Sequence, residues 1–332
     1  NKRYNIVSKL LEEFILAEEL RKYLYEVYDL ERLCGKLSFG SANGKDLLQL
    51  KASLKVLPSI KEKLEKINFY EKITTMDDLY NLLEKSIYEE PPNTLKEGYL
   101  IKDGYNSELD ELKSIRSGGK DFIASLEEQE RERTGIANLK VGYNKVFGYY
   151  IEISKGQVDK VKDEYGYERR QTLANCERYI SPLLKEKEAL VLNAEEKIIE
   201  LEYNLFMDVK ESIKSEIFKL KAIASDLAEL DAIISLTIVA DECGLVRPEI
   251  LDERRVEIVE GRHPVVERVS KKEYVANDCM MSEEVNTLLI TGPNMSGKST
   301  YMRQLAIIII MAQIGSFVPA KSAKLPIFDK IF

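Results

Sequence analysis

Residues 287–304 read Thr-Leu-Leu-Ile-Thr-Gly-Pro-Asn-Met-Ser-Gly-Lys-Ser-Thr-Tyr-Met-Arg-Gln, and this stretch decides how the C-terminal part of the chain folds. Within it, Gly292 to Ser299 fits the pattern G-x-x-x-x-G-K-[ST] in full, which is the P-loop motif. The apolar residues 287–290 predict a short buried strand before the motif, and the apolar-rich residues from Ser299 onward predict a helix after it. Strand, glycine-rich loop and helix in this order are the context that the motif requires.

The residue types of this loop suit the binding of phosphate groups. Glycine lets backbone N–H groups curl around phosphate oxygens without a Cβ in the way, and the following helix N-terminus adds partial positive charge. We expect Lys298 to reach the β- and γ-phosphates of ATP and the Ser299 hydroxyl to bind Mg²⁺. The sequence therefore predicts a protein that handles ATP, with ATP and Mg²⁺ as cofactors.

Upstream of the loop, the chain is predicted to be mainly helical. Residues 183–243 contain neither glycine nor proline and predict a long helix with a break in it. A coiled-coil-like seam is expected along it, because apolar residues recur at heptad spacing. The seam consists of Leu184, Val191, Ala194, Ile198, Leu201 and Leu205. The first hundred residues also show helical spacing, and the first buried face is predicted from Leu10, Leu11, Phe14, Ile15 and Leu20.

A highly charged helix is predicted over residues 107–133. We interpret its charge run as a solvated face, and Gly118 and Gly119 as the site of a possible kink. Residues 139–154 change to β-branched and aromatic residues, which predicts a strand or a hairpin with its turn at Asn144 and Lys145. Residues 169–180 predict a further strand, and residues 255–259 a short strand near the P-loop segment.

Composition limits the classes of protein that remain. The chain has 332 residues and a net charge of −8, which argues against a surface coated in basic residues but leaves uneven charge possible. No apolar run approaches the ~18–20 residues of a membrane span, so no membrane partner is expected. The cysteines are far apart and there is one histidine, His263, which excludes a zinc cluster of the usual spacing. Unpaired thiols suggest a cytoplasmic location; the cysteines are Cys34, Cys176, Cys243 and Cys279.

The run from Thr291 to Gln304 resembles the nucleotide-binding signature of the MutS family of DNA mismatch-repair proteins, and the Pro-Asn-Met core separates it from most other P-loop ATPases. Other segments agree with this resemblance, which covers essentially the whole chain: residues 40–44, 134–136, 139–154, 261–265 and 315–320. It implies a mainly α fold with a small β-rich inserted clamp domain, followed by the beginning of an α/β P-loop ATPase domain of the ABC type. The expected segments are residues 1–116 (core and lever helices), 117–205 (clamp with flanking lever helices), 206–245 (returning lever) and 246–332 (truncated ATPase domain with the P-loop).

The resemblance also implies partners and site residues. The family binds double-stranded DNA, and the whole protein is expected to bind mismatched duplexes. A homodimer and a MutL-type repair partner are also expected. The expected location is the cytoplasm, and the nucleoid when the protein is bound to DNA. Tyr274 matches the position whose ring packs against adenine, with Val275 beside it. The expected nucleotide site is therefore Gly292, Pro293, Asn294, Met295, Ser296, Gly297, Lys298, Ser299, Thr300, Tyr274 and Val275, with Ser299 for Mg²⁺.

The predicted clamp carries a mild excess of positive charge. Between Asn138 and Ser181 there are eight Lys and Arg against six Asp and Glu, in a chain that is acidic overall. Positive side chains at this place are expected to contact DNA phosphates, which positions DNA without reading its sequence. The candidates are Lys140, Lys145, Arg169, Arg170 and Arg178. His263, which precedes Pro264, is interpreted as a structural residue that hydrogen-bonds a turn, and Arg303 and Gln304 either sense nucleotide or make local contacts.

Two departures from the family pattern shape the expected activity. The chain starts without an initiator methionine and lacks the mismatch-reading N-terminal domain, and it stops before the acidic Walker B residues, so it is expected to be a piece of a longer ATPase. No catalytic residue is expected in this piece, which should neither recognise a mismatch nor turn over ATP efficiently alone. The alternatives are a family paralogue that clamps branched DNA, a structural coiled-coil protein that binds nucleotide without using it, and a DNA-binding module that acts through the clamp alone.

Overall fold

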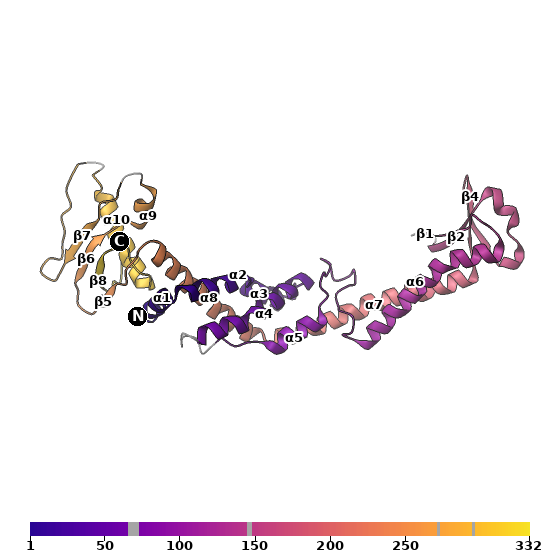
Figure 1. The fold of residues 1–332 in the computed structure, drawn as a ribbon, viewed down its shortest axis with the longest axis horizontal. Helices are drawn as coiled ribbons and strands as arrows, with labels where there is room; N and C mark the ends of the chain where they lie inside the picture. Colours follow the sequence, from indigo (N-terminus) through magenta and orange to yellow (C-terminus); the bar gives the residue numbers. More distant parts are fainter. Residues whose placement is uncertain (66–72, 145–147, 271–272, 294–295) are drawn as a thin grey trace. The chain divides into compact units, whose positions relative to one another are not determined.

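A computed structural model describes residues 1–65, 73–144, 148–270, 273–293 and 296–332 of the chain, which divides into two compact units. Unit 1 comprises residues 1–34, 52–76 and 218–332, and unit 2 comprises residues 35–51 and 77–217. Most described residues are helical, with one small sheet in each unit (Figure 1). The predicted fold class is thus confirmed. In the described ranges no helix is both long enough and apolar enough to span a lipid bilayer.

The helices of unit 1 begin at the N-terminus with a break that the sequence did not predict. The first helix ends at Glu12; the next residue, Glu13, has a φ of −114° and a ψ of 56°, which are not helical, so the second helix starts with a new phase. Leu16 and Leu20 are buried, whereas Ile15, predicted on the buried face, is 80% exposed. The unit contains α1 (Lys2–Glu12), α2 (Phe14–Tyr25), nearly all of α8 (Ile217–Glu242), and parts of α3 (Leu30–Ser38) and α4 (Gly44–Glu65).

In unit 2, two long helices run side by side toward a small sheet (Figure 1). These are α6 (Ser107–Thr134) and α7 (Pro182–Ser215), preceded by α5 (Asp77–Ser86). Side-chain oxygens of Asn106 and Ser181 accept backbone hydrogen bonds at the starts of α6 and α7, and Gly135 ends α6 in the left-handed conformation. α6 continues through Gly118 and Gly119 without interruption, and a kink there stays a prediction.

The buried face of α7 agrees with the predicted seam only as far as Ile198. Beyond it the buried positions are Glu202 and Phe206 rather than Leu201 and Leu205, which are half-buried. A straight helix has 3.6 residues per turn, so its buried face drifts away from a strict heptad pattern. The predicted break in the long helical stretch is confirmed at Glu216, between α7 and α8.

The sheet of unit 2 is antiparallel, with strand order β1-β2-β4-β3. The predicted hairpin is confirmed, and its turn residue Lys145 lies outside the described residues. Residues 169–180 form two strands instead of one, because the chain reverses at residues 173–175, where the Leu173 N–H donates to the Cys176 carbonyl. Ile151 and Ile153 are fully buried against α6 and α7. The elements are β1 (Lys140–Asn144), β2 (Gly148–Ser154), the 3-10 helices η1 (Lys155–Lys160) and η2 (Asp163–Tyr165), β3 (Glu168–Thr172) and β4 (Cys176–Ile180).

The sheet of unit 1 is mixed, with order β5-β8-β6-β7; only β5 and β8 are parallel. It consists of β5 (Glu249–Leu251), β6 (Val256–Gly261), β7 (Asn277–Met281) and β8 (Ser322–Pro326), with helices α9 (Pro264–Val269) and α10 (Lys298–Ile314). Ile308 and Ala312 of α10 are buried against Ile258 and Val318. The predicted strand at 255–259 is confirmed as part of β6.

The strand predicted at residues 287–290 is wrong for the described structure. These residues have no regular secondary structure and pair with no described strand, and Leu289 is 90% exposed. A strand needs a neighbour that supplies backbone hydrogen-bond partners, and none of the four strands of this sheet pairs with residues 287–290. An apolar run alone therefore did not determine its conformation.

Candidate functional site

The P-loop leads directly into α10, as its sequence predicted. Gly292 has a φ of 155° and Gly297 a φ of 92°, backbone conformations that favour glycine. A Cβ built on Gly292 would lie 3.0 Å from the Ser296 hydroxyl oxygen, so the loop curves tightly at this point. Asn294 and Met295, also predicted for the site, lie outside the described residues.

Lys298 is the first residue of α10 and folds back over the loop. Its ammonium donates hydrogen bonds to the carbonyl oxygens of Gly292 and Pro293, the second at 2.8 Å. Ser299 and Thr300 follow in the first helical turn, where Ser299 is exposed. A lysine ammonium, a serine hydroxyl and a helix start are thus brought together by a single segment of eight residues.

These groups fit the phosphates of a nucleotide. The first N–H groups of a helix have no acceptor within the helix, and the N-cap residue of α10 is Gly297, which has no side chain to accept from them. The helix dipole and the ammonium of Lys298 both favour an anion at this end. The donor set is therefore suited to polyphosphate, and the exposed Ser299 hydroxyl is a hard oxygen ligand of the kind that Mg²⁺ takes.

Tyr274, predicted to pack against adenine, is connected to the same helix. Its hydroxyl donates to Oε1 of Gln304 at 2.6 Å, and Gln304 is completely buried. Burial raises the pKa of the Tyr274 phenol above its ordinary value, so the phenol stays a neutral donor. Val275, beside it, is 77% exposed. Of the two interpretations of Gln304, the structure supports the local contact.

A second tyrosine fixes the start of α10. The hydroxyl of Tyr301 donates to the carbonyl oxygen of Asp278 in β7 at 2.9 Å. Burial, together with the neighbouring Cys279 thiol, raises the pKa of Tyr301 to about 12. The first turn of α10 is thereby tied to the edge strand of the sheet, and sequence reasoning gave this residue no role.

His263 has the structural role that was predicted for it. Its Nδ1 accepts from the backbone N–H groups of Val265 and Val266, both at 3.3 Å, so it caps the N-terminus of α9. Histidine thus replaces the usual serine or aspartate cap here, with Pro264 at the first helical position.

The predicted DNA-contacting residues fall into two groups. Arg169 and Arg170 lie on β3, an edge strand, with side chains 63% and 46% exposed, and Lys140 on the opposite edge is also exposed. Arg169 and Arg170 each pair with a carboxylate, Glu177 and Glu168. Arg178 is less exposed, at 19%, and is held on the sheet face: it donates to Glu152 and Gln171, and its guanidinium carbon lies 4.1 Å from the Tyr150 ring centroid. Lys145 lies outside the described residues.

Carboxylates of α6 and α7 tie this sheet to the helices. Glu127 accepts from the Val141 N–H and Glu188 from the Tyr149 N–H, both at 2.9 Å. Glu130 is buried and accepts from Arg133 and the Tyr167 hydroxyl. The interpretation of this charge run as a solvated face is therefore wrong for part of it. Only the tertiary structure reveals the partners, since a carboxylate on a helix looks the same in sequence whether it is solvated or bonded.

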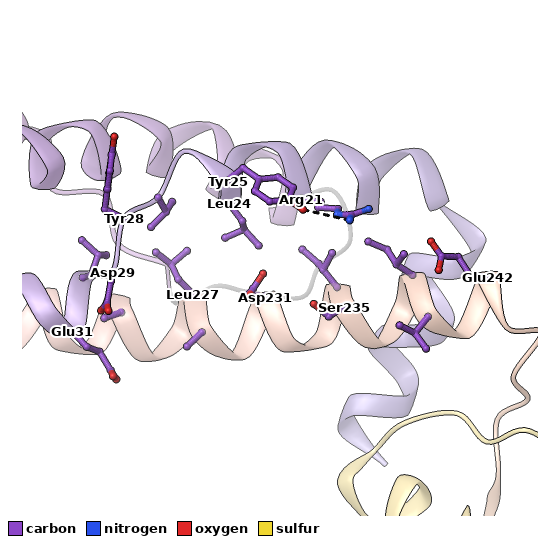
Figure 2. A pocket seen from close by; sticks show the side chains of 17 residues that line it. Arg21, Leu24, Tyr25, Tyr28, Asp29, Glu31, Leu227, Asp231, Ser235 and Glu242 are labelled. Carbon is purple, nitrogen blue, oxygen red and sulfur yellow. Dashed lines mark hydrogen bonds between the residues drawn. The ribbon is translucent and has the colours of Figure 1, made fainter. Parts of the chain in front are cut away.

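A groove in the described part of the chain is lined by residues far along the sequence from the P-loop. It has a volume of about 730 Å³ and lies between α2 and α8; Figure 2 shows Leu24 and Leu227 lining it, with Asp231 and Ser235 on the α8 side. Arg21 donates to the Tyr25 hydroxyl at 3.4 Å on its α2 side. No P-loop residue lines it, so the geometry of the loop, and not groove size, identifies the candidate site.

The loop, its helix and the sheet beneath it define a P-loop nucleotide-binding protein, joined in one chain to a two-helix hairpin that carries a small sheet. Two family models match the chain: MutS family domain IV over residues 104–197, and MutS domain V over residues 288–332. The chain belongs to the MutS family.

Similar proteins cover nearly all of the chain. The DNA mismatch repair protein MutS of Bacillus pumilus is 54% identical over 337 residues, and that of Bacillus subtilis 53% identical; each alignment covers 99% of this chain and 39% of the relative. The MutS protein of Halothermothrix orenii is 52% identical, with 99% and 37% covered. The chain thus spans about two fifths of the length of the curated relatives that it matches.

Proposed function

We propose that this chain is the DNA-clamping and nucleotide-binding part of a DNA mismatch repair protein. The observation that carries the proposal is the P-loop at the start of α10, where Lys298 lies over the loop and the helix N-terminus has no side-chain cap. The names of the similar proteins support the choice of mismatch repair over the other family alternatives. The antiparallel sheet on α6 and α7 is the proposed DNA-contacting clamp.

The proposed cofactors are ATP and Mg²⁺. Lys298 and the backbone N–H groups of the loop would hold the phosphates, and the Ser299 hydroxyl would ligate the metal. Tyr274 and Val275 are proposed to border the adenine. Bound ATP supplies a phosphoanhydride bond whose hydrolysis releases energy. The role proposed for the P-loop residues of this chain is to bind and orient the ATP.

The activity of the whole protein is also a proposal. It comprises ATP hydrolysis to ADP and phosphate, recognition of mismatched duplex DNA, formation of a homodimer and the recruitment of a MutL-type partner, in the cytoplasm and on the nucleoid. The high identity to proteins named for mismatch repair, over nearly the whole of this chain, supports all of these together.

Replacing Lys298 with alanine is expected to weaken Mg-ATP binding by about 10- to 100-fold, the value of a charged hydrogen-bond donor at a phosphate. The measurement is isothermal titration calorimetry of Mg-ATP into the chain and into Lys298→Ala. The matched control is Lys330→Ala, which removes the same group from an exposed position outside the loop. Its affinity should stay within twofold of the unchanged chain.

Two results would contradict the nucleotide proposal. Equal affinity of Lys298→Ala and the unchanged chain would place bound ATP away from the loop. The absence of measurable binding to the unchanged chain, with helical content intact by circular dichroism, would mean that this segment does not bind ATP.

For the clamp, we propose that Lys140, Lys145, Arg169, Arg170 and Arg178 contact the DNA backbone. Arg169 and Arg170 carry most of this proposal, because their side chains are exposed and lie on one strand. Arg178 would have to give up its hydrogen bonds to Glu152 and Gln171 to bind a phosphate, so its substitution is expected to affect the sheet more than the DNA.

The double substitution Arg169→Gln and Arg170→Gln is expected to weaken duplex binding and to reduce its salt dependence. Each lost phosphate contact lowers the slope of log K against log salt concentration by about 0.9. Fluorescence anisotropy with labelled duplex at several salt concentrations measures both quantities. Lys214→Gln, on the last turn of α7, is the matched control for loss of positive charge and should leave the slope unchanged.

A competing role for these arginines is to protect an edge strand from pairing with another chain. In that case the double variant would self-associate in analytical ultracentrifugation while the salt slope of the remaining monomer stayed the same. That result would remove Arg169 and Arg170 from the DNA interface.

A further inference from the structure

The helix that begins in the P-loop is held at its far end by the N-terminal helix. α10 ends at Ile314, and two neighbouring residues of α1, 308 and 311 positions earlier in the chain, bond its last turn. The hydroxyl of Tyr4 donates to the carbonyl oxygen of Ala312, and Nη1 of Arg3 donates to that of Ile314 at 2.8 Å. We call Arg3 and Tyr4 the α10 latch.

The last turn of a helix leaves its carbonyl groups without partners inside the helix. Backbone groups supply some of the missing hydrogen-bond donors: the N–H of Gly315 donates to the carbonyl of Ala312 and the N–H of Ser316 donates to that of Met311, both at 3.0 Å. The latch adds a second donor at Ala312 and a charged donor at Ile314. A cation at this end also suits the negative end of the helix dipole.

Gly315 makes room for the latch. It has a φ of 92°, which suits a helix end, and a Cβ built on it would lie 2.8 Å from Cβ of Arg3. Any other residue at position 315 would therefore push Arg3 away from α10. One glycine thus serves both the end of α10 and the approach of α1.

Of the two latch residues, Tyr4 is firmly held, whereas the Arg3 side chain is 51% exposed. Tyr4 is 2% exposed and its ring centroid lies 6.4 Å from that of Phe317. The guanidinium of Arg247 lies 5.8 Å from the Tyr4 ring centroid and donates to Asn5 at 2.7 Å. Burial raises the pKa of the Tyr4 phenol, so it remains a hydrogen-bond donor.

α10 connects the latch to the phosphate-binding groups as one rigid piece. Its 17 residues contain neither glycine nor proline, and at 1.5 Å per residue it is about 25 Å long. Tyr301 ties the first turn to β7 and the latch ties the last turn to α1, so the position of the helix is set at both ends. A shift at the last turn moves the first turn, which carries Lys298 and Ser299.

We propose that Arg3 and Tyr4 are positioning residues for the nucleotide site: they hold α10 where its N-terminus can receive the phosphates. The inference rests on the proposed nucleotide binding. Coupling between two sites is reciprocal, so nucleotide at the first turn of α10 also tightens the bonds between its last turn and α1. The latch thereby links occupancy of the P-loop to the helices of unit 1.

The test is Mg-ATP titration of the whole chain carrying Tyr4→Phe, which keeps the buried ring and removes only the hydroxyl. The expected result is about three- to tenfold weaker binding, the value of one lost hydrogen bond, and a larger loss when Arg3→Met is added. Tyr25→Phe, which removes an exposed tyrosine hydroxyl from α2, is the matched control and should bind within twofold of the unchanged chain.

Hydrogen exchange followed by mass spectrometry separates positioning from simple stabilisation. In the unchanged chain, Mg-ATP should slow exchange in peptides covering α1, and this effect should disappear in the Tyr4→Phe and Arg3→Met double variant. A variant that melts at lower temperature but keeps both its affinity and the ATP-dependent protection of α1 would overturn the inference. If the unchanged chain binds ATP, Lys298→Ala does not, and the latch variants bind as the unchanged chain does, only the latch inference is wrong. If the unchanged chain does not bind ATP, the nucleotide proposal is wrong as well.

Discussion

Replacing Glu202 with alanine is expected to lower the free energy of unfolding by about 3–5 kcal/mol, the usual cost of removing one partner from a buried ion pair. Glu202 lies on α7 and is completely buried. Its Oε2 accepts from the Leu100 N–H at 3.1 Å, and its Oε1 lies 3.2 Å from Nζ of Lys113 as an ion pair without hydrogen-bond geometry. Both partners lose their buried acceptor in the variant.

The ion pair also holds a strained segment. Gly98 and Tyr99 have φ values of 77° and 57°, and the second is costly for a residue with a side chain. Lys113 donates to the Ile101 carbonyl and to Asp103. Burial alone would lower the pKa of Lys113, but its hydrogen bond to Asp103 and the charge of Glu202 hold that pKa above the ordinary value. Lys113 therefore stays charged, and its charge is stabilised only while a carboxylate lies beside it.

Urea denaturation of Glu202→Ala and the unchanged chain measures this effect, and hydrogen exchange in peptides covering residues 96–104 localises it. Glu202→Gln keeps an acceptor for Leu100 and should cost less. Adding Lys113→Met to Glu202→Ala removes the stranded cation and should recover part of the loss. A cost below about 1 kcal/mol for Glu202→Ala would mean that water reaches Lys113 readily and that the pair is not buried in solution.

The parts of the fold that sequence could predict are those set by local pattern. The start of α10 at the P-loop follows from glycine spacing, and the β1–β2 hairpin follows from residue type. The cap at His263 follows from the proline after it. In each case the determining residues are within a few positions of each other.

The sequence-based predictions that were wrong share a different cause, which is contact between residues far apart in the sequence. Glu202 disturbs the predicted apolar seam because Lys113 and Leu100 supply its partners, 89 and 102 positions away. Glu127 and Glu188 look like solvated helix residues until the strand N–H groups that they bind are in place. Residues 287–290 have the composition of a strand but no described neighbour. The latch connects residues near the two ends of the chain, and no local sequence pattern predicts it.

Gly119 presents a further case in which tertiary contact decides the role of a residue. The sequence Gly118-Gly119 inside a charged helix predicted an interruption, but α6 continues through both residues. A Cβ on Gly119 would overlap Cγ2 of Val191 on α7, whereas a Cβ on Gly118 would meet nothing within 4 Å. Gly119 therefore permits the close approach of α6 to α7, and Gly118 carries only the cost of glycine in a helix.

Gly119→Leu is accordingly expected to destabilise the chain by about 3 kcal/mol, the upper part of the range for overpacking. Val191 cannot easily turn away, because a valine in a helix has one strongly preferred rotamer. Gly118→Ala is the matched control and should stabilise the chain by about 0.5–1 kcal/mol through helix propensity. Urea denaturation followed by circular dichroism measures both changes.

Gly118→Ala and Gly119→Ala make the same chemical change at adjacent positions, but they are expected to change the free energy of unfolding in opposite directions. Gly119→Ala gains the same helix propensity as Gly118→Ala, but its new methyl must displace Val191, so its net effect should be destabilising. Adding Val191→Ala to Gly119→Ala removes the overlapping methyls, and the two substitutions should cost less together than the sum of their separate costs. If Gly118→Ala and Gly119→Ala stabilise the chain equally, α6 and α7 do not approach as closely in solution as the structure describes, and the helical hairpin that carries the clamp sheet is more loosely packed.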